Sequence, residues 1–201
     1  SVFVSVSINY RLVPDHLFPA QIEDTKCAVR WLRANAEKWH IDPKRIGAVG
    51  ASAGAHLAMM LGTMNADDGL EGTGGSSDES SRVQAVVSFA GPTNLQAELP
   101  DASQKLVGDF LGGLASAVPE NAAAASPITY VNAGDPPMLL VQGTRDPLVP
   151  HAQATEMIEA LTSAGVDGRV EFLIGAGHGW PDEHERVMRA AFEFLHQHLD
   201  P

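Results

Sequence analysis

Short runs of apolar and β-branched residues alternate along the chain with longer segments in which apolar residues recur every three or four positions. Runs of the first kind predict buried strands, and segments of the second kind predict helices with one apolar face. The predicted strands are Ser1–Ile8, Arg45–Val49, Gln84–Ala90, Met138–Gln142 and Arg169–Ile174. The predicted helices are Gln21–His40, Ala53–Met64, Ser103–Leu111, His151–Ala164 and Glu183–Leu199, and Asn121–Ala125 is an Ala-rich piece.

This alternation of strands with helices indicates βαβ units and a mostly parallel, doubly wound α/β sheet. About five strands with flanking helices are expected, in a single domain over residues 1–201. One region breaks the simple alternation. Residues 95–125 are mixed in character, and they predict either a small cap or a surface crossover.

Composition narrows the class of protein. With 201 residues and 44% apolar residues, the chain can bury a real core, which excludes a disordered tail or a collagen-like chain. The net charge of −12 argues against binding to nucleic acid or to an anionic membrane surface. The apolar runs are shorter than the roughly 20 residues that a membrane span needs. Cys27 is the single cysteine, so no internal disulfide can form.

The pentapeptide Gly50-Ala51-Ser52-Ala53-Gly54 lies between a predicted strand and a predicted helix. Such a turn is sharp and crowded, so small residues must flank the serine, whose hydroxyl projects at the carboxyl edge of the sheet. The N-terminus of the helix favours a developing negative charge, and the backbone N–H of Ala53 is the expected oxyanion donor. The motif therefore predicts that Ser52 is a nucleophile, and the alternative is a tight turn without chemistry.

A serine nucleophile needs a base, and the chain offers eight histidines. His178 lies in the Gly-rich loop Gly175–Gly179, directly after the predicted strand Arg169–Ile174. The carboxyl ends of strands face the ligand crevice in sheets of this kind. His178 is therefore the predicted base, whereas His196 and His198 lie on the last helix, where a surface role is expected.

The base in turn needs a carboxylate to orient it, and Asp146 directly follows the predicted strand Met138–Gln142. Asp135 precedes that strand and so falls at the opposite edge of the sheet, while Asp182 is too near His178 to come from another strand end. The order serine, aspartate, histidine matches that of α/β hydrolases. Asp146 would orient the imidazole, and activity should fall at low pH as the imidazole becomes protonated.

Substrate contacts are harder to place from sequence. Trp180 follows His178 by two positions, and Asn94 follows a predicted strand, so both are candidate substrate-binding residues. His56 lies one helical turn beyond Ser52 and is expected to pack along its helix. The chain has no His-Glu-x-x-His motif and no cluster of Cys and His, so no metal or cofactor is expected.

The segment Tyr10–Ala20 (YRLVPDHLFPA) resembles a motif of bacterial esterases related to hormone-sensitive lipase. Ile41–Ile46 leads into the Ser52 turn as it does in that group. Ser126–Tyr130 and Gly143–Pro150 resemble its feruloyl-esterase-like and acetyl-esterase-like branch. The resemblance covers essentially the whole chain. It implies an α/β-hydrolase fold and a carboxylesterase acting on short acyl esters, with acetyl or feruloyl esters of plant polysaccharide as candidate substrates.

Members of that family carry a His-Gly-Gly-Gly-type loop upstream, and its backbone supplies the second half of the oxyanion hole. No such sequence precedes Tyr10. We therefore expect a fragment without the N-terminal strands, with an intact triad but an incomplete oxyanion hole. Loss of one donor typically lowers the rate about 10²–10³-fold. Ser1–Ile8 and Arg45–Val49 would then pair directly or leave unpaired edges that favour a homo-oligomer.

Two further functions stay open at this point. One is a serine peptidase similar to prolyl oligopeptidase, which shares the order of the triad. The other is a truncated, poorly active hydrolase-fold module that only binds. The expected partner is a small-molecule or polysaccharide-linked ester, and the sequence leaves open whether the compartment is cytoplasmic or secreted.

Overall fold

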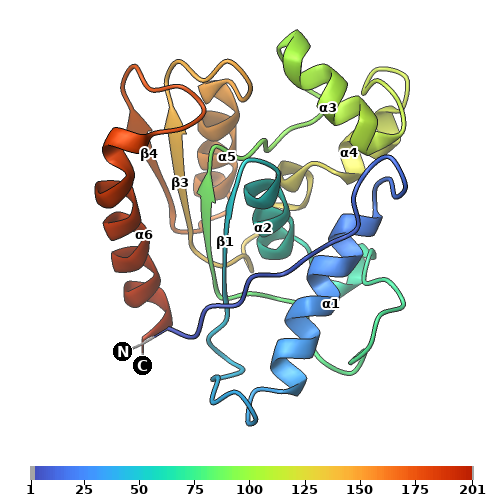
Figure 1. Cartoon of the computed structure of the whole chain (residues 1–201), viewed down its shortest axis with the longest axis vertical. Coiled ribbons are helices and arrows are strands. Elements are labelled where there is room, and N and C mark those ends of the chain that lie inside the picture. Colours follow the sequence, from blue (N-terminus) through green and yellow to red (C-terminus); the bar gives the residue numbers. More distant parts are fainter. Residues whose placement is uncertain (1–2, 201) are drawn as a thin grey trace.

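Four parallel strands form one sheet in the order β1-β2-β3-β4 (Figure 1). The computed structural model describes residues 3–200. The strands are β1 (Gly47–Ala51), β2 (Ala85–Phe89), β3 (Met138–Gly143) and β4 (Gly168–Leu173). Because neighbouring strands run parallel, all four carboxyl ends meet at one edge of the sheet.

Helices lie between the strands and after the last one. They are α1 (Ala20–Ala34), α2 (Ala53–Thr63), α3 (Asp101–Leu111), α4 (Pro119–Ala124), α5 (His151–Ser163) and α6 (His184–Leu199). Short 3-10 turns occupy Ala66–Asp68, Pro127–Tyr130 and Pro181–Glu183.

Both faces of the sheet are covered, as the doubly wound prediction requires. Val86 and Leu140 pack into a core formed with α1, α2 and α5, whereas Val87 and Val141 pack against α6. The alternation follows from the period of two along a strand. Figure 1 shows α6 on one side of the sheet and α1 and α2 on the other. The predicted α/β architecture is confirmed.

About five strands were expected, and the described residues form four. Residues 3–8, which belong to the predicted strand Ser1–Ile8, form no ladder, and Ser1 and Val2 lie outside the described residues. Phe3 instead stacks on Phe192 of α6, with ring centroids 6.3 Å apart. An apolar, β-branched segment becomes a strand only when a neighbouring strand satisfies its backbone groups.

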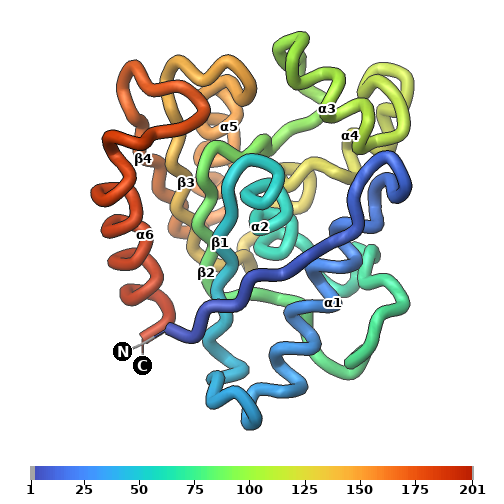
Figure 2. Tube along the Cα trace, in the orientation of Figure 1, coloured from blue at the N-terminus to red at the C-terminus, as the bar shows by residue number. Residues whose placement is uncertain are grey.

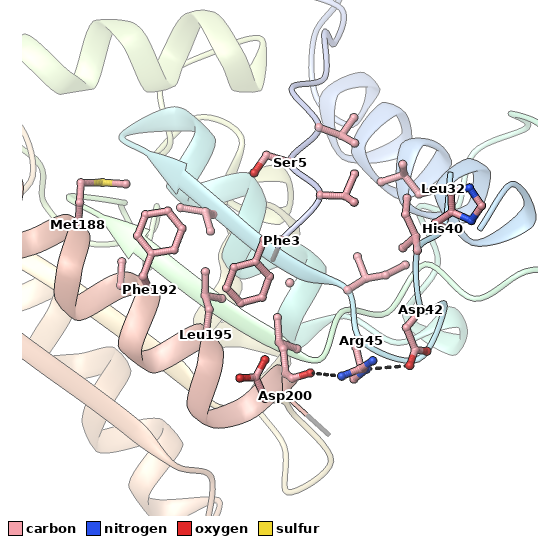
Figure 3. Close-up of a pocket in the computed structure, with 18 residues that line it drawn as sticks. Phe3, Ser5, Leu32, His40, Asp42, Arg45, Met188, Phe192, Leu195 and Asp200 are labelled. Carbon is pink, nitrogen blue, oxygen red and sulfur yellow. Dashed lines mark hydrogen bonds and ion pairs between the residues drawn. The ribbon is translucent and has the colours of Figure 1, made fainter. Parts of the chain in front are cut away.

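A groove of about 430 Å³ separates this segment from β1. Val6 and Val49 of β1 are among its lining residues. Phe3, Phe192 of α6 and Leu32 of α1 also line it (Figure 3). Figure 2 shows the N-terminal trace passing β1 on its way to α1. β1 is therefore an edge strand, and the side chain of Val49 is 49% exposed.

The predicted helix Gln21–His40 ends early, since α1 stops at Ala34 and the chain continues in turns. Asn35 lies directly after the helix. Its backbone N–H (3.0 Å) and its side-chain amide (2.8 Å) both donate to the carbonyl of Trp31 in the last turn.

A buried ion cluster fastens α1 to the acidic loop that follows α2. The ammonium of Lys26 lies 2.9 Å from Glu71, and Arg30 also pairs with Glu71. Both cationic side chains are 1% exposed. Burial by itself raises the pKa of Glu71, but hydrogen bonds from Lys26 and Ser81 and the charge of Arg30 outweigh it, so the pKa lies below its usual value.

Residues 95–125 form a small apolar cluster of their own at the carboxyl edge of the sheet. Leu95, Leu99 and Leu111 are buried there together with Ala122 of α4 and Ala125, which follows it. α3 and α4 therefore stand over the edge where the strands end, as Figure 1 shows.

Candidate active site

Ser52 occupies the sharp turn between β1 and α2. Its backbone has φ 52° and ψ −117°, a left-handed conformation that is strained for a residue with a side chain. Gly50 makes the turn possible, because a Cβ there would lie 2.2 Å from the carbonyl of Gly54. The chain folds back on itself at this point, so only glycine fits at position 50.

Asp146 lies in the loop after β3, and its side chain is fully buried. Oδ1 accepts hydrogen bonds from the backbone N–H groups of Leu148 (2.8 Å) and Val149 (2.9 Å). Oδ2 accepts from the side-chain amide of Gln142 at 3.0 Å. Three donors therefore hold the carboxylate in one orientation before any histidine is considered.

His178 follows β4, and its loop is fastened directly to the loop that carries Asp146. The N–H of Arg145 donates to the carbonyl of Ala176 (2.9 Å), and the N–H of Gly175 donates to Oγ1 of Thr144 (2.8 Å). Gly143 permits this close approach, because a Cβ there would lie 2.2 Å from the carbonyl oxygen of Gly177.

The three predicted triad residues meet at the carboxyl edge of the sheet. Nδ1 of His178 lies 2.8 Å from Oδ2 of Asp146, and Nε2 lies 2.9 Å from Oγ of Ser52. An aspartate on Nδ1 favours the tautomer in which Nδ1 carries the proton, which leaves Nε2 free to accept the serine proton. The His178 side chain is 24% exposed, so a ligand can reach it.

Gln142, the penultimate residue of β3, was not singled out from the sequence. Its side-chain amide donates both to Asp146 and to the carbonyl of Val149 (2.9 Å), and the residue is buried. It therefore ties both ends of the Asp146 loop to the strand. A polar residue at the end of an otherwise apolar strand was the only available sequence signal.

The other predicted site residues, Ala53, Trp180 and Asn94, lie in different surroundings. Ala53 begins α2 beside Ser52, where the first N–H groups of a helix have no partner within the helix. The indole of Trp180 donates to the carbonyl of Gly177 (3.0 Å) and packs edge-on against Phe89. The side chain of Asn94 donates to Glu156 at 3.2 Å.

A cavity of about 280 Å³ opens beside Ser52, and neither Trp180 nor Asn94 is among the described residues that line it. The lining side chains are mostly aliphatic or aromatic and come from four stretches of the chain: residues 10–21 at the start of α1, residues 52–57 at the start of α2, residues 92–110 between β2 and the end of α3, and residues 148–149 after β3. They are Tyr10, Leu12, Val13, Gln21, Ser52, Ala53, His56, Leu57, Pro92, Leu95, Leu99, Ser103, Leu106, Val107, Phe110, Leu148 and Val149.

His56 packs inside the molecule, as expected. Its Nε2 lies 2.6 Å from the carbonyl oxygen of Ala125, and its ring meets Phe110 edge-on. Burial lowers the pKa of His56, against a smaller opposite effect of the Ala125 carbonyl. The ring is therefore neutral near pH 7, donates through Nε2–H and links α2 to the end of α4.

Within residues 3–200, no helix is both long and apolar enough to cross a membrane. No three or more acidic, histidine or cysteine side chains in that range come together as a metal site would require.

Comparison with known proteins identifies the family and the fold of the chain. A model of the BD-FAE family matches residues 1–161. The chain belongs to the BD-FAE family. The α/β-hydrolase fold that the sequence resemblance implies is confirmed, because the similar solved structures are esterases of that fold.

Two curated relatives are esterases of Mycobacterium tuberculosis. Esterase LipC is 35% identical over 89% of this chain, and esterase LipQ is 36% identical over 81%. The chain spans less than half the length of each, 45% and 39%.

Two solved structures show how closely the fold corresponds. A truncated carbohydrate esterase from gut microbiota superposes with a TM-score of 0.86 at 30% identity, over 95% of this chain and 72% of that one. Propionate-bound esterase 2 of Thermogutta terrifontis superposes with a TM-score of 0.78 at 29% identity, over 96% and 72%.

Proposed function

We propose that this protein is a serine carboxylesterase in which Ser52, His178 and Asp146 act as the catalytic triad. The observation that carries the proposal is the position of His178, whose two ring nitrogens lie 2.8 Å from Asp146 and 2.9 Å from Ser52. An imidazole held in this way can take a proton from a serine and return it to a leaving group. The esterase names of its relatives support the same conclusion.

The reaction follows from the positions of these groups. Ser52 Oγ attacks the acyl carbon while Nε2 of His178 takes its proton, and Asp146 stabilises the resulting imidazolium. The backbone N–H of Ala53 stabilises the negative oxygen of the tetrahedral intermediate. The alcohol leaves with the proton from Nε2, and water then attacks the acyl-enzyme by the same route.

The substrates are proposed to be esters of short acyl chains. Esterase 2 of Thermogutta terrifontis has been solved with propionate and with butyrate bound, and another similar structure is named a carbohydrate esterase. These names favour small acyl groups and keep acetyl or feruloyl esters of plant polysaccharide as candidate natural substrates.

A fluorophosphonate probe together with p-nitrophenyl butyrate hydrolysis tests the proposal. We expect labelling and turnover in the native chain, and neither in Ser52→Ala. Cleavage of an aminoacyl-proline amide instead of the ester would favour the peptidase alternative. Labelling without turnover would favour a poorly active module, and no labelling of the folded chain would contradict the proposal.

A further inference from the structure

The cavity beside Ser52 has a lining suited to an apolar group. None of its lining residues is Asp, Glu, Lys or Arg, within the part of the chain that the structure describes. Two of its polar side chains are already engaged, since Ser103 Oγ donates to the carbonyl of Leu148 at 2.5 Å and His56 donates to that of Ala125. Among the described lining residues, Gln21 Oε1 is a buried side-chain atom without a hydrogen-bond partner. One such acceptor leaves a sugar ring with few partners here, whereas an alkyl or aryl group would lose only water contacts.

The position of the cavity relative to the triad indicates which half of an ester it receives. Ser52, Ala53 and Leu57 line it, but His178 and Asp146 are not among the described lining residues. The leaving oxygen of the ester must lie near Nε2 of His178, because that nitrogen protonates it. The cavity is therefore on the side of the acyl group.

α3 supplies one wall of this cavity. Phe110 is held in place by edge-on packing against both Phe18 and His56, with ring centroids 5.6 Å apart in each pair. Leu106 lies one helical turn earlier, lines the cavity and is 61% exposed. Phe110 is therefore a rigid wall, while Leu106 lies at the mouth, where it can be changed without opening the core.

We propose that this cavity is the acyl pocket, that it favours larger apolar acyl groups over acetyl among the esters the site accepts, and that Leu106 of α3 determines this selectivity. The assignment rests on the proposed esterase function and makes α3 a cap over the site. The volume of about 280 Å³ lies just below the range of pockets for drug-sized ligands, roughly 300–1,000 Å³, and suits a compact acyl chain. An acetyl methyl would leave most of the pocket unfilled.

The test compares kcat/KM for p-nitrophenyl acetate, butyrate and hexanoate. Each added methylene that is buried is expected to raise kcat/KM up to about fourfold. Leu106→Asp should lower the hexanoate-to-acetate ratio at least about tenfold, because a carboxylate at the mouth opposes the apolar chain. Leu114→Asp is the matched control. Leu114 is 56% exposed and lies just after α3 outside the lining, so its ratio should stay as in the native chain.

A binding measurement separates this proposal from the esterase proposal. In the Ser52→Ala background, calorimetry should show p-nitrophenyl hexanoate binding more tightly than the acetate, and Leu106→Asp should remove the difference. Unchanged binding and an unchanged ratio would overturn the acyl-pocket assignment even if Ser52 is labelled by the fluorophosphonate. The native chain could bind the longer ester more tightly and yet never react with the fluorophosphonate. That result would contradict the esterase proposal, and the cavity would then be a pocket that only binds apolar ligands.

Discussion

The Nε2 atom of His178 lies 2.9 Å from the Oγ of Ser52, although 126 positions of sequence separate the two residues. If they act as one unit, their substitutions must not be additive. Ser52→Ala and His178→Ala should each lower kcat for p-nitrophenyl butyrate by about 10⁴-fold or more, and the double variant should be little worse than either. His16→Ala, in an exposed loop, is the control. If the loss of kcat in the double variant equalled the product of the two single losses, the two residues would act independently, and a shared catalytic role would be contradicted.

The contact between the two catalytic loops predicts an effect of a single methyl group. In Gly143→Ala the new Cβ would lie 2.2 Å from the carbonyl oxygen of Gly177, so the His178 loop must shift. We expect kcat to fall by at least about a hundredfold, since a 1 Å displacement can have that effect. A Cβ at Gly177 itself would meet nothing within 4 Å, so Gly177→Ala should retain most of the activity. Equal rates in the two variants would refute this role of Gly143.

Gln142 is expected to act through Asp146 as a positioning residue. Gln142→Leu removes the amide that holds Oδ2 of Asp146 and leaves the carbonyl of Val149 without that donor. A hydrogen bond to a charged group contributes about 1.5–3 kcal/mol, so kcat should fall by roughly ten- to a hundredfold. KM should change little, because Gln142 does not line the cavity beside Ser52. A purely structural role would instead lower the melting temperature with kcat unchanged.

The lowered pKa of His56 predicts that the free energy of unfolding decreases in mild acid. Because its pKa is lowered in the folded state, its neutral form stabilises the fold above the unfolded value of about 6.5, and this contribution is lost as the pH falls. His56→Gln can keep a donor for the Ala125 carbonyl without titrating. Urea unfolding at pH 7, 6 and 5 should therefore show a smaller loss of unfolding free energy in the variant.

The pKa of Asp135 is raised in the folded state, whereas that of His56 is lowered, so the two groups change stability in opposite directions with pH. The effect of His56 must therefore be measured as the difference between His56→Gln and the native chain. Burial raises the pKa of Asp135 to about 6, so its contribution to stability is lost as the pH rises through that value. This contribution is present in both proteins and cancels in the difference. Parallel pH curves for the native chain and His56→Gln would show that His56 does not contribute.

The ion cluster on α1 predicts a large effect at an acidic loop residue. Glu71→Ala leaves Lys26 and Arg30 buried without their carboxylate. Breaking a fully buried pair typically costs about 3–5 kcal/mol, and because the Glu71 side chain is 29% exposed the loss should lie at or below the lower end of that range. Urea denaturation measures the change without screening the charges. Glu37→Ala, at an exposed position, should change the unfolding free energy by less than about 0.5 kcal/mol. Equal effects at the two positions would argue against the cluster.

Features that depend on near neighbours in the chain were predictable. Hydrophobic period and turn residues located β1 to β4 and the strand-to-helix turn at Ser52. In a parallel sheet all strands end at one edge, so the sequence places Asp146 and His178 at the same edge as Ser52. The roles of these residues in catalysis stay a prediction for the experiments above.

Sequence alone determined the α/β alternation and the residues at the strand ends, because both follow from local spacing. Only the tertiary structure decided that residues 3–8 form no strand, since a ladder needs a partner that local sequence does not specify. It also decided the contacts of Gln142 with Asp146, and it assembled the cavity beside Ser52 from four separate segments. Such contacts depend on how distant side chains fill a shared volume, and no local pattern encodes that packing.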